Sequence, residues 1–284
     1  MQRDLPAILS LVASDQLPAQ PDCTQTDLLR AQAAQGTIDR VWWDTLVTVQ
    51  TIVAICGKEV VGAASYGQQE TVPTGPIPAD GSGCILWLHA RENPAVVDAL
   101  LTAIEHALEA CPRIYAFWFA TPLTLGLEGL PVSYRSITHQ ALLTHGFVGH
   151  DDWLYMVGPV ISQAERIAEV ETREYGWLLS VQEQGEQIAE ADIGLEKDHV
   201  GHLRWLWVHE NWRGHGLGTK LFLQASAHLY AAGARSMVLY VDHDDPVERD
   251  RSSAIHLYQR HGFTIVDHLW SYWRGIPPAW FTPH

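Results

Sequence analysis

The fold of this chain is decided by residues 204–220, which read Arg204-Trp-Leu-Trp-Val-His-Glu-Asn-Trp-Arg-Gly-His-Gly-Leu-Gly-Thr-Lys220. The apolar and aromatic run at 203–208 predicts a buried strand. Apolar residues then recur at every fourth position and predict one face of a helix over 217–232: Leu217, Leu221, Ala225 and Leu229. The glycines of the stretch therefore lie where a strand turns into a helix: Gly214, Gly216 and Gly218.

This strand-to-helix turn predicts a site for phosphate. The first backbone N–H groups of a helix lack partners within the helix, and the helix dipole places about half a positive charge at the same end. Glycines let an anion approach these N–H groups without a side chain in the way. The alternative is an ordinary tight turn without a ligand.

Composition restricts the class of protein. The 284 residues are 47% hydrophobic and 18% charged, which is typical of a folded globular protein of one large or two ordinary domains. The net charge of −15 argues against a nucleic-acid partner and would attract a cationic small molecule, although it also serves solubility alone. The four cysteines and 15 histidines lack the spacing of metal ligands, so we expect reduced thiols and no metal site.

The chain also lacks the patterns that direct a protein to a membrane. No apolar run reaches membrane-spanning length, and the first residues do not show the basic-then-apolar pattern of a signal peptide. We therefore expect a cytoplasmic monomer or homodimer without a membrane partner.

Hydrophobic periodicity gives the order of the elements. In the first half we expect helices at 4–14, 26–34, 94–110 and 136–144, strands at 46–55, 60–65, 84–89, 114–119 and 153–156, and a loop at 68–83. In the second half we expect helices at 162–172, 217–232 and 252–260, and strands at 175–181, 187–195, 202–208, 236–241 and 265–273. Tryptophans of these strands are expected in the core: Trp205, Trp207, Trp270 and Trp273.

The two halves repeat one another. Trp87-Leu-His-Ala-Arg-Glu-Asn93 aligns with Trp205-Leu-Trp-Val-His-Glu-Asn211, and His145-Gly-Phe147 aligns with His261-Gly-Phe263. The separations of 118 and 116 residues nearly agree, as an internal duplication requires. We place the boundary between residues 158 and 159, which gives domains at 1–158 and 159–284.

The first half lacks the glycine turn. At the position of the turn it reads Pro94-Ala-Val-Val-Asp-Ala99, where Asp98 takes the place of the phosphate. A carboxylate there would repel an anion, so we expect the first half to bind no nucleotide in this way.

Two motifs together resemble the GNAT superfamily of acyl-CoA-dependent N-acetyltransferases. The first is Arg213-x-x-Gly216-x-Gly218 after a strand, and the second, one helix and one strand later, is Ala254-x-x-Leu-Tyr258-x-x-x-Gly262-Phe263. The resemblance covers 175–273. A weaker and altered form of the same pattern occurs in the first half, as in tandem members of the superfamily. It implies an α/β fold with two GNAT-like halves, each a mixed, mainly antiparallel sheet flanked by helices.

The resemblance also implies a reaction and a site. An acetyl group would pass from acetyl-CoA to a primary amine of a small, possibly cationic, acceptor by direct attack on the thioester. Tyr258 would protonate the departing CoA thiolate. The residues that would bind the cofactor are Leu206, Trp207 and Val208 for pantetheine, and Arg213, Gly214, His215, Gly216, Leu217, Gly218, Thr219 and Ser253 for the phosphates.

The chain departs from the superfamily pattern at three positions. Arg251 replaces a common asparagine, Glu210 a common proline, and Arg204 a glutamate that serves some members as the base. The general base is therefore not given by the motif. Among the candidates we favour Glu190 and Asp242, the others being Asp192, Glu210 and His243. Two alternatives stay open: a non-catalytic acyl-CoA-binding or protein-interaction module, and an acetyltransferase acting on a protein N-terminus or lysine.

Overall fold

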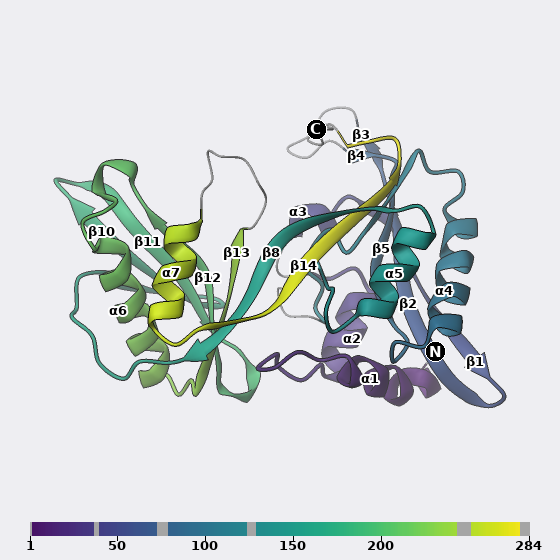
Figure 1. Cartoon of the computed structure of the whole chain (residues 1–284), viewed down its shortest axis with the longest axis horizontal. Helices are drawn as coiled ribbons and strands as arrows, with labels where there is room; N and C mark the ends of the chain where they lie inside the picture. The colour runs from purple at the N-terminus through teal and green to yellow at the C-terminus, as the bar shows by residue number, and fades with distance from the viewer. Residues whose placement is uncertain (1, 37–39, 73–78, 124–128, 243–250, 279–284) are drawn as a thin grey trace. The chain divides into compact units, whose positions relative to one another are not determined.

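The structure is a computed structural model and describes residues 2–36, 40–72, 79–123, 129–242 and 251–278 (Figure 1). The chain divides into two compact units. Unit 1 consists of Met1–Leu17, Asp22–Trp153 and Asp267–His284, and unit 2 consists of Pro18–Pro21 and Leu154–Val266.

Unit 1 carries a sheet in the order β1-β2-β5-β6-β14. Its elements are η1 (Gln2–Asp4), α1 (Leu5–Ser14), α2 (Gln25–Gln32), α3 (Arg40–Trp43), β1 (Leu46–Cys56), β2 (Glu59–Gln69), β3 (Thr71–Val72), β4 (Ala79–Asp80), β5 (Gly83–His89), α4 (Pro94–Ala107), β6 (Arg113–Ala116), β7 (Leu130–Pro131), α5 (Ser136–Thr144) and the later part of β14 (Thr264–Gly275). Two buried hydrophobic clusters form the core of this unit. One includes residues of α4 and α5, and the other includes residues of α1 and α2.

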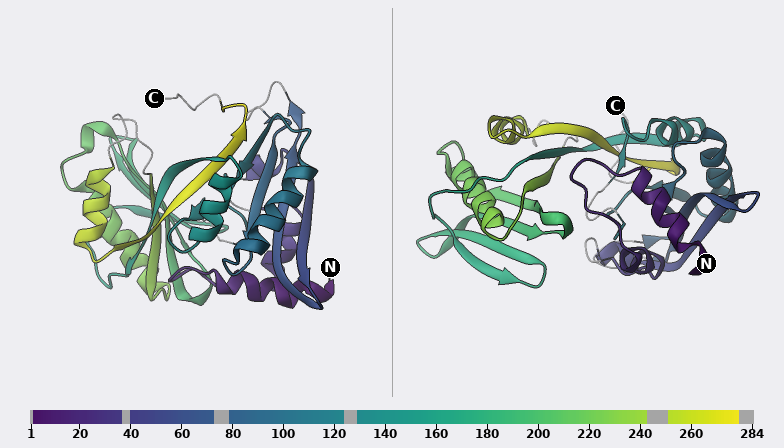
Figure 2. Two further views of the ribbon diagram at one scale, coloured as in Figure 1. Left: turned by 45° about the vertical axis from the view of Figure 1, so that its right-hand side comes forward. Right: turned by 90° about the horizontal axis from the view of Figure 1, so that it is seen from below.

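Unit 2 carries a sheet in the order β8-β13-β12-β11-β10-β9. Its elements are β8 (Val148–Pro159), β9 (Glu169–Arg173), β10 (Gly176–Glu183), β11 (Glu186–Leu195), η2 (Lys197–His199), β12 (Val200–Val208), η3 (Glu210–Trp212), α6 (Leu217–Ala231), β13 (Ser236–Asp242) and α7 (Ser252–Arg260). Helix α6 packs on one face of this sheet (Figure 2), because its Leu221, Ala225 and Leu229 are fully buried against strand residues such as Leu179 and Ile193.

Both units are built on the same plan, which confirms the tandem arrangement. In each, an antiparallel hairpin (β1–β2 or β10–β11) is followed by a third strand (β5 or β12) that pairs in parallel with the next (β6 or β13). The third strand has a one-residue bulge at Leu86 in unit 1 and at Arg204 in unit 2, where the pairing register skips a residue. The two bulges are 118 residues apart, the same separation as the tryptophan motifs.

The last strand of each half of the sequence belongs, at least in part, to the unit formed mainly by the other half. β8 follows α5 of the first half, yet its residues from Leu154 belong to unit 2, where the strand neighbours β13. β14 follows α7 of the second half, yet its residues 272–275 pair with β6 of unit 1. The units therefore exchange their final strands, a division that differs from the expected single boundary after residue 158.

Residues 162–172 are not helical, contrary to the sequence prediction. The segment is extended and ends in β9, which pairs with β10 as the outermost strand of the sheet. The buried side chain of Gln224 on α6 accepts hydrogen bonds from the backbone N–H groups of Ile167 and Ala168, at 2.7 and 2.8 Å. These tertiary hydrogen bonds replace the ones that a helix would have made.

The prediction that Trp205 lies in the core is also wrong, because its side chain is 52% exposed. It stands opposite Asp192 on β11, on the sheet face that α6 does not cover. Trp273, in contrast, is buried as expected.

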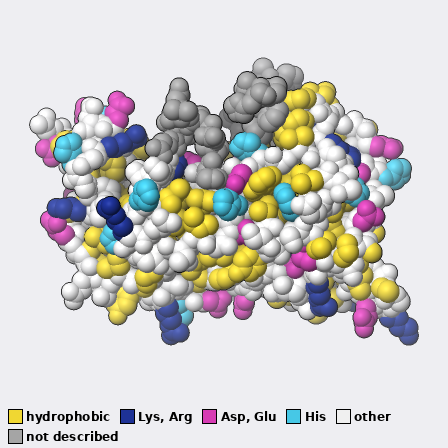
Figure 3. Space-filling view, viewed as in Figure 1, with side chains coloured by type: hydrophobic (Ala, Val, Ile, Leu, Met, Phe, Trp, Pro, Cys, Tyr) yellow, Lys and Arg dark blue, Asp and Glu magenta, His cyan; other side chains and the backbone are white. Residues whose placement is uncertain are grey.

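Over the described part of the chain, no helix is both long and apolar enough to cross a membrane. Lysine and arginine side chains lie singly on the face of the molecule seen in Figure 3 and form no continuous basic surface there.

Candidate functional site

The candidate site of unit 2 starts at the unpaired edge of β12. This strand pairs with β13 only from Val200 to Leu203, whereas its other edge pairs with β11 as far as Val208. The bulge at Arg204 coincides with the point where β12 and β13 part. Residues 206–208 thus present one backbone edge that β13 does not cover, and an extended ligand arm can pair with such an edge as an added strand would.

The glycine turn follows directly and leads into α6. Gly214 and Gly216 have φ of 77° and 78°, in the left-handed region that favours glycine. Gly216 is the N-cap of α6 and makes no side-chain cap hydrogen bond. A Cβ added at either glycine would meet no atom within 4 Å, so the space in front of these residues is open. The helix N-terminus is thus accessible to an anion.

Gly218 has a different role, in packing. A Cβ added there would lie 3.4 Å from the Cγ2 atom of Val208, so its missing side chain brings the first turn of α6 close to the end of β12. The exposed strand edge and the helix N-terminus are therefore adjacent within unit 2.

Arg213 stabilises the conformation of the turn. Its Nε donates to the Val208 carbonyl at 3.0 Å, and its backbone N–H donates to the Glu210 carbonyl at 3.1 Å. Since both groups already have partners inside the turn, the N–H groups of 214–219 are better placed than Arg213 to receive phosphate oxygens. His215 is exposed at the tip, while Leu217 and Thr219 are partly buried in the first turn of α6.

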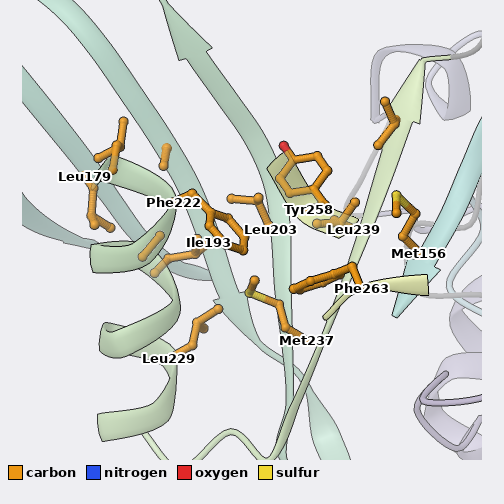
Figure 4. Packing of buried hydrophobic residues seen from close by; sticks show 14 of the residues in the cluster. Met156, Leu179, Ile193, Leu203, Phe222, Leu229, Met237, Leu239, Tyr258 and Phe263 are labelled. Atoms are coloured by element: carbon orange, nitrogen blue, oxygen red, sulfur yellow. The ribbon is translucent and has the colours of Figure 1, made fainter. Parts of the chain in front are cut away.

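Tyr258 lies in the core between β12 and β13. Its ring is 6% exposed and packs edge-on against Phe222, with 5.4 Å between centroids, and at a tilt against Phe263, with 6.0 Å between centroids (Figure 4). Burial raises the pKa of the Tyr258 phenol, and the charge of Arg251 opposes that rise only in part. Because its pKa is raised, the hydroxyl remains protonated and able to donate a proton.

Arg251 and Asp242 form an ion pair that the sequence did not reveal. Nε and Nη2 of Arg251 both donate to Oδ2 of Asp242, at 3.0 and 2.6 Å. The arginine is therefore paired within the protein although it is partly exposed, and the carboxylate that we favoured as a base is held by a cation. Ser253 is exposed in the first turn of α7, and His243 lies outside the described residues.

Of the two favoured bases, Glu190 is the one without an arginine partner in the described structure. It stands opposite Trp207 across β11 and β12, and accepts a hydrogen bond from Nε2 of Gln187. The neighbouring candidate Asp192 is bound by Nε and Nη2 of Arg204, at 2.9 and 2.6 Å. Of Glu190 and Asp192, Glu190 is thus the carboxylate that no ion pair neutralises in the described structure.

The corresponding place in unit 1 cannot accept an anion in the same way. Asn93 caps α4, and its side chain accepts hydrogen bonds from the N–H groups of Ala95 and Val96 at 3.1 and 3.3 Å. Asp98 contacts His145 instead of facing the helix end. The residue equivalent to Tyr258 at the 116-residue spacing is Leu142, which is fully buried and cannot donate a proton.

A buried charge cluster fills the place where β5 parts from β6. Nη2 of Arg135 donates to the Leu88 carbonyl at 2.8 Å, and its Nε donates to Glu92 at 2.6 Å. Asp15 lies 3.6 Å from this arginine and 2.9 Å from Nδ1 of His89. Burial alone would raise the pKa of Asp15, but the His89 hydrogen bond and the Arg135 charge hold that pKa below its usual value. A guanidinium thus occupies the strand edge of unit 1 that remains open in unit 2.

This cluster was not predicted from the sequence, although the sequence contains a signal for it. Arg135 is the N-cap of α5 and Arg251 is the N-cap of α7, and the two are separated by the same 116 residues as the His-Gly-Phe motifs. The repeat therefore marks both arginines as equivalent.

Replacing Arg135 with alanine is expected to lower the free energy of unfolding by about 3–5 kcal/mol, because Glu92 and Asp15 would be left as buried carboxylates without a cation. Urea denaturation followed by circular dichroism measures the loss. Arg91→Ala is the control, since Arg91 contacts only Ser10 at the surface among the described residues and should change stability by less than about 0.5 kcal/mol. A loss of less than about 1 kcal/mol for Arg135→Ala would contradict the importance of the cluster.

The fold and the site of unit 2 define a class of protein: an α/β protein in which a parted strand edge lies beside an uncapped helix N-terminus, an arrangement suited to a phosphate-bearing ligand. Residues 174–265 match the sequence profile described as the acetyltransferase (GNAT) domain. Residues 174–265 are therefore a GNAT acetyltransferase domain, and the protein is an acyltransferase. No curated protein sequence matches the chain.

Solved structures agree with the fold over nearly the whole chain. A GCN5-related N-acetyltransferase from Sphaerobacter thermophilus is similar with a TM-score of 0.60 at 15% identity, over 98% of this chain and 94% of that one. A tandem GNAT protein from the clavulanic acid biosynthesis pathway is similar with a TM-score of 0.65 at 12% identity, over 98% of this chain and 96% of that one. At these identities the similarity concerns the fold, and it confirms the expected architecture of two GNAT-like halves.

Proposed function

We propose that the protein is an N-acetyltransferase that transfers an acetyl group from acetyl-CoA to a primary amine of a small acceptor. The observation that carries the proposal is the adjacency of the open β12 edge at 206–208, the uncapped N-terminus of α6 and the buried phenol of Tyr258. The strand edge would pair with the pantetheine arm, and the N–H groups of 214–219 would receive the pyrophosphate.

The chemistry would be direct transfer. The amine attacks the thioester carbonyl, the tetrahedral intermediate collapses, and the CoA thiolate leaves with the proton of the Tyr258 hydroxyl. A backbone N–H of the open β12 edge would stabilise the negative charge that develops on the carbonyl oxygen. The proton lost by the ammonium would pass to Glu190, directly or through water, because Asp192 and Asp242 are already bound by arginines.

The acceptor and the cellular setting belong to the same proposal. The net charge of −15 favours a small cationic amine over nucleic acid, whose phosphates such a surface repels. None of the four cysteines is part of a disulfide in the described structure, which supports a reducing, cytoplasmic setting. We propose a monomer or homodimer that acts without a membrane partner.

Acetyl-CoA at one hundred times its Kd should stabilise the protein by about 2.7 kcal/mol and raise the unfolding midpoint temperature by roughly 5 °C or more. Differential scanning fluorimetry measures this shift, with adenosine as a control that lacks the pyrophosphate and pantetheine. Absence of any shift, and of heat in calorimetry, would refute the cofactor assignment.

Measuring the release of CoA thiol then distinguishes the proposed enzyme from the two alternative functions. Acetyl-CoA incubated with a panel of small amines should release CoA thiol in amounts equal to the acetylated amine. Binding without release from any amine would favour the non-catalytic module, and release only with peptides would favour an acetyltransferase acting on a protein N-terminus or lysine.

A further inference from the structure

Unit 1 contains a cavity for which the proposed acetyl transfer has no use. Its volume is about 210 Å³, and most of its wall is aromatic: Trp42, Phe117, Trp118, Phe119 and Trp153. Asp152 and Ser271 supply polar side chains, and among the described residues no lysine or arginine lines the cavity. A concave site with aromatic walls and a few polar groups is the usual form of a small-molecule site.

The aromatic walls are held in fixed orientations. The rings of Trp42 and Trp118 lie 6.2 Å apart and nearly perpendicular, at 86°, so the two indoles form adjoining walls. Phe119 packs edge-on against Trp43 at 5.3 Å, and Trp118 lies 5.1 Å from Tyr115. Rings packed in this way keep their orientation before any ligand arrives.

The backbone at Phe117 is strained where it enters the cavity. Phe117 directly follows β6 and has φ of 55°, a left-handed conformation that is rare for a bulky residue. Its N–H donates to the Ile85 carbonyl at 3.0 Å, which holds the strained residue in place. Such strain persists only where the surroundings fix it, and it is concentrated at ligand and active sites.

The cavity also carries negative charge. Oδ2 of Asp152 accepts the Ser271 N–H at 2.9 Å, and Oδ1 lies 2.7 Å from Nδ1 of His150. Each carboxylate oxygen can accept more than one hydrogen bond, so these contacts leave the oxygens able to attract a cation. Burial raises the pKa of Tyr272, the residue after Ser271, and the charges of Asp151, Asp152 and Asp267 raise it further.

We propose that this cavity binds a small organic cation with a quaternary or tertiary ammonium group. The faces of aromatic rings attract such a cation, and a quaternary ammonium needs no hydrogen-bond acceptor in return. In proportion to a cavity of about 150 Å³ that holds benzene, this one holds about eight non-hydrogen atoms. The ligand does not react here, so the inference is independent of the acetyl transfer in unit 2.

Choline and 3,3-dimethylbutan-1-ol test the inference, because they have nearly the same shape and differ in charge. Isothermal titration of the full chain at low ionic strength should give one choline site, and the neutral alcohol should bind at least about tenfold more weakly. Equal affinities would overturn the proposal in favour of a neutral apolar cavity. Absence of choline binding up to about 50 mM would likewise overturn it.

Variants of residues that line the cavity test whether choline binds there. Trp118→Leu and Asp152→Asn should each weaken choline binding about tenfold or more, and the asparagine Oδ1 can still accept the Ser271 N–H. Asp151→Asn is the matched control, since it removes one charge from the neighbouring residue of β8, which does not line the cavity, and should leave the affinity within about twofold. Circular dichroism verifies folding. If Trp118→Leu does not fold, Trp42→Leu replaces it, and unchanged affinity in the folded cavity variants would contradict the assignment.

Discussion

Replacing Gly216 with glutamate is expected to raise the Kd for acetyl-CoA at least about a hundredfold while leaving the protein folded. The new carboxylate would stand at the uncapped N-terminus of α6, where it would neutralise the positive end of the helix and repel the pyrophosphate. A Cβ at this position meets no atom within 4 Å, so the fold accommodates the side chain. Isothermal titration with acetyl-CoA measures the change.

Gly185→Glu is the matched control for this prediction. Gly185 lies in the turn between β10 and β11 of the same unit, with φ of 86°, and an added Cβ there also meets no atom within 4 Å. It therefore carries the same cost of a non-glycine residue in the left-handed region and the same added charge, away from a helix N-terminus. We expect its Kd to stay within about threefold of the unmodified protein. A similar loss in both variants would show that charge or strain alone, rather than the glycine turn, governs binding.

Replacing Tyr258 with phenylalanine is expected to lower kcat by a factor of about 10²–10⁴ and to leave the KM for acetyl-CoA within about threefold. The substitution removes only the hydroxyl, because phenylalanine can keep the ring contacts with Phe222 and Phe263. Without its proton donor, the enzyme would have to expel CoA as an unprotonated thiolate. Steady-state kinetics with a saturating amine acceptor measures both constants.

The pKa of Tyr258 adds a second readout. Since burial raises this pKa above the ordinary value of about 10, the phenol stays protonated throughout the neutral range, and its ionisation should cause no loss of kcat below about pH 10. Tyr155→Phe is the control, because it removes a buried tyrosine hydroxyl of unit 2 that donates to the Pro18 carbonyl. Tyr155→Phe should cost stability and leave kcat nearly unchanged. If Tyr258→Phe behaved in the same way, Tyr258 would be a packing residue and not the acid.

The cofactor end of the site could be predicted from the sequence, because it is encoded by residues that are neighbours in the chain. The strand ending at Val208, the glycines with open left-handed positions and the apolar stripe of α6 follow one another within 30 residues. Local propensity and the special conformations of glycine determine such a segment without reference to the rest of the molecule. The repeat spacing then predicted a second, altered copy of the same plan in the first half.

The acceptor end could not be predicted in this way, because it depends on which side chains meet across elements. The sequence shows that Asp242 and Arg251 are both present, but only the tertiary structure pairs them and thereby leaves Glu190 as the stronger candidate base. The segment 162–172 has the composition of a helix, yet Gln224 of α6 and the edge of β10 draw it into an extended form.

What the sequence by itself determined is therefore the local strand, turn and helix that bind an anion, together with the duplication. Only the tertiary structure decided that β8 and β14 exchange units, that Arg135 closes the strand edge of unit 1, and that the chain after β6 turns aside at Phe117 beside a cavity. The physical reason is the range of the interactions. Periodicity and glycine conformation act over a few residues, whereas strand pairing, buried ion pairs and cavities join residues more than a hundred positions apart.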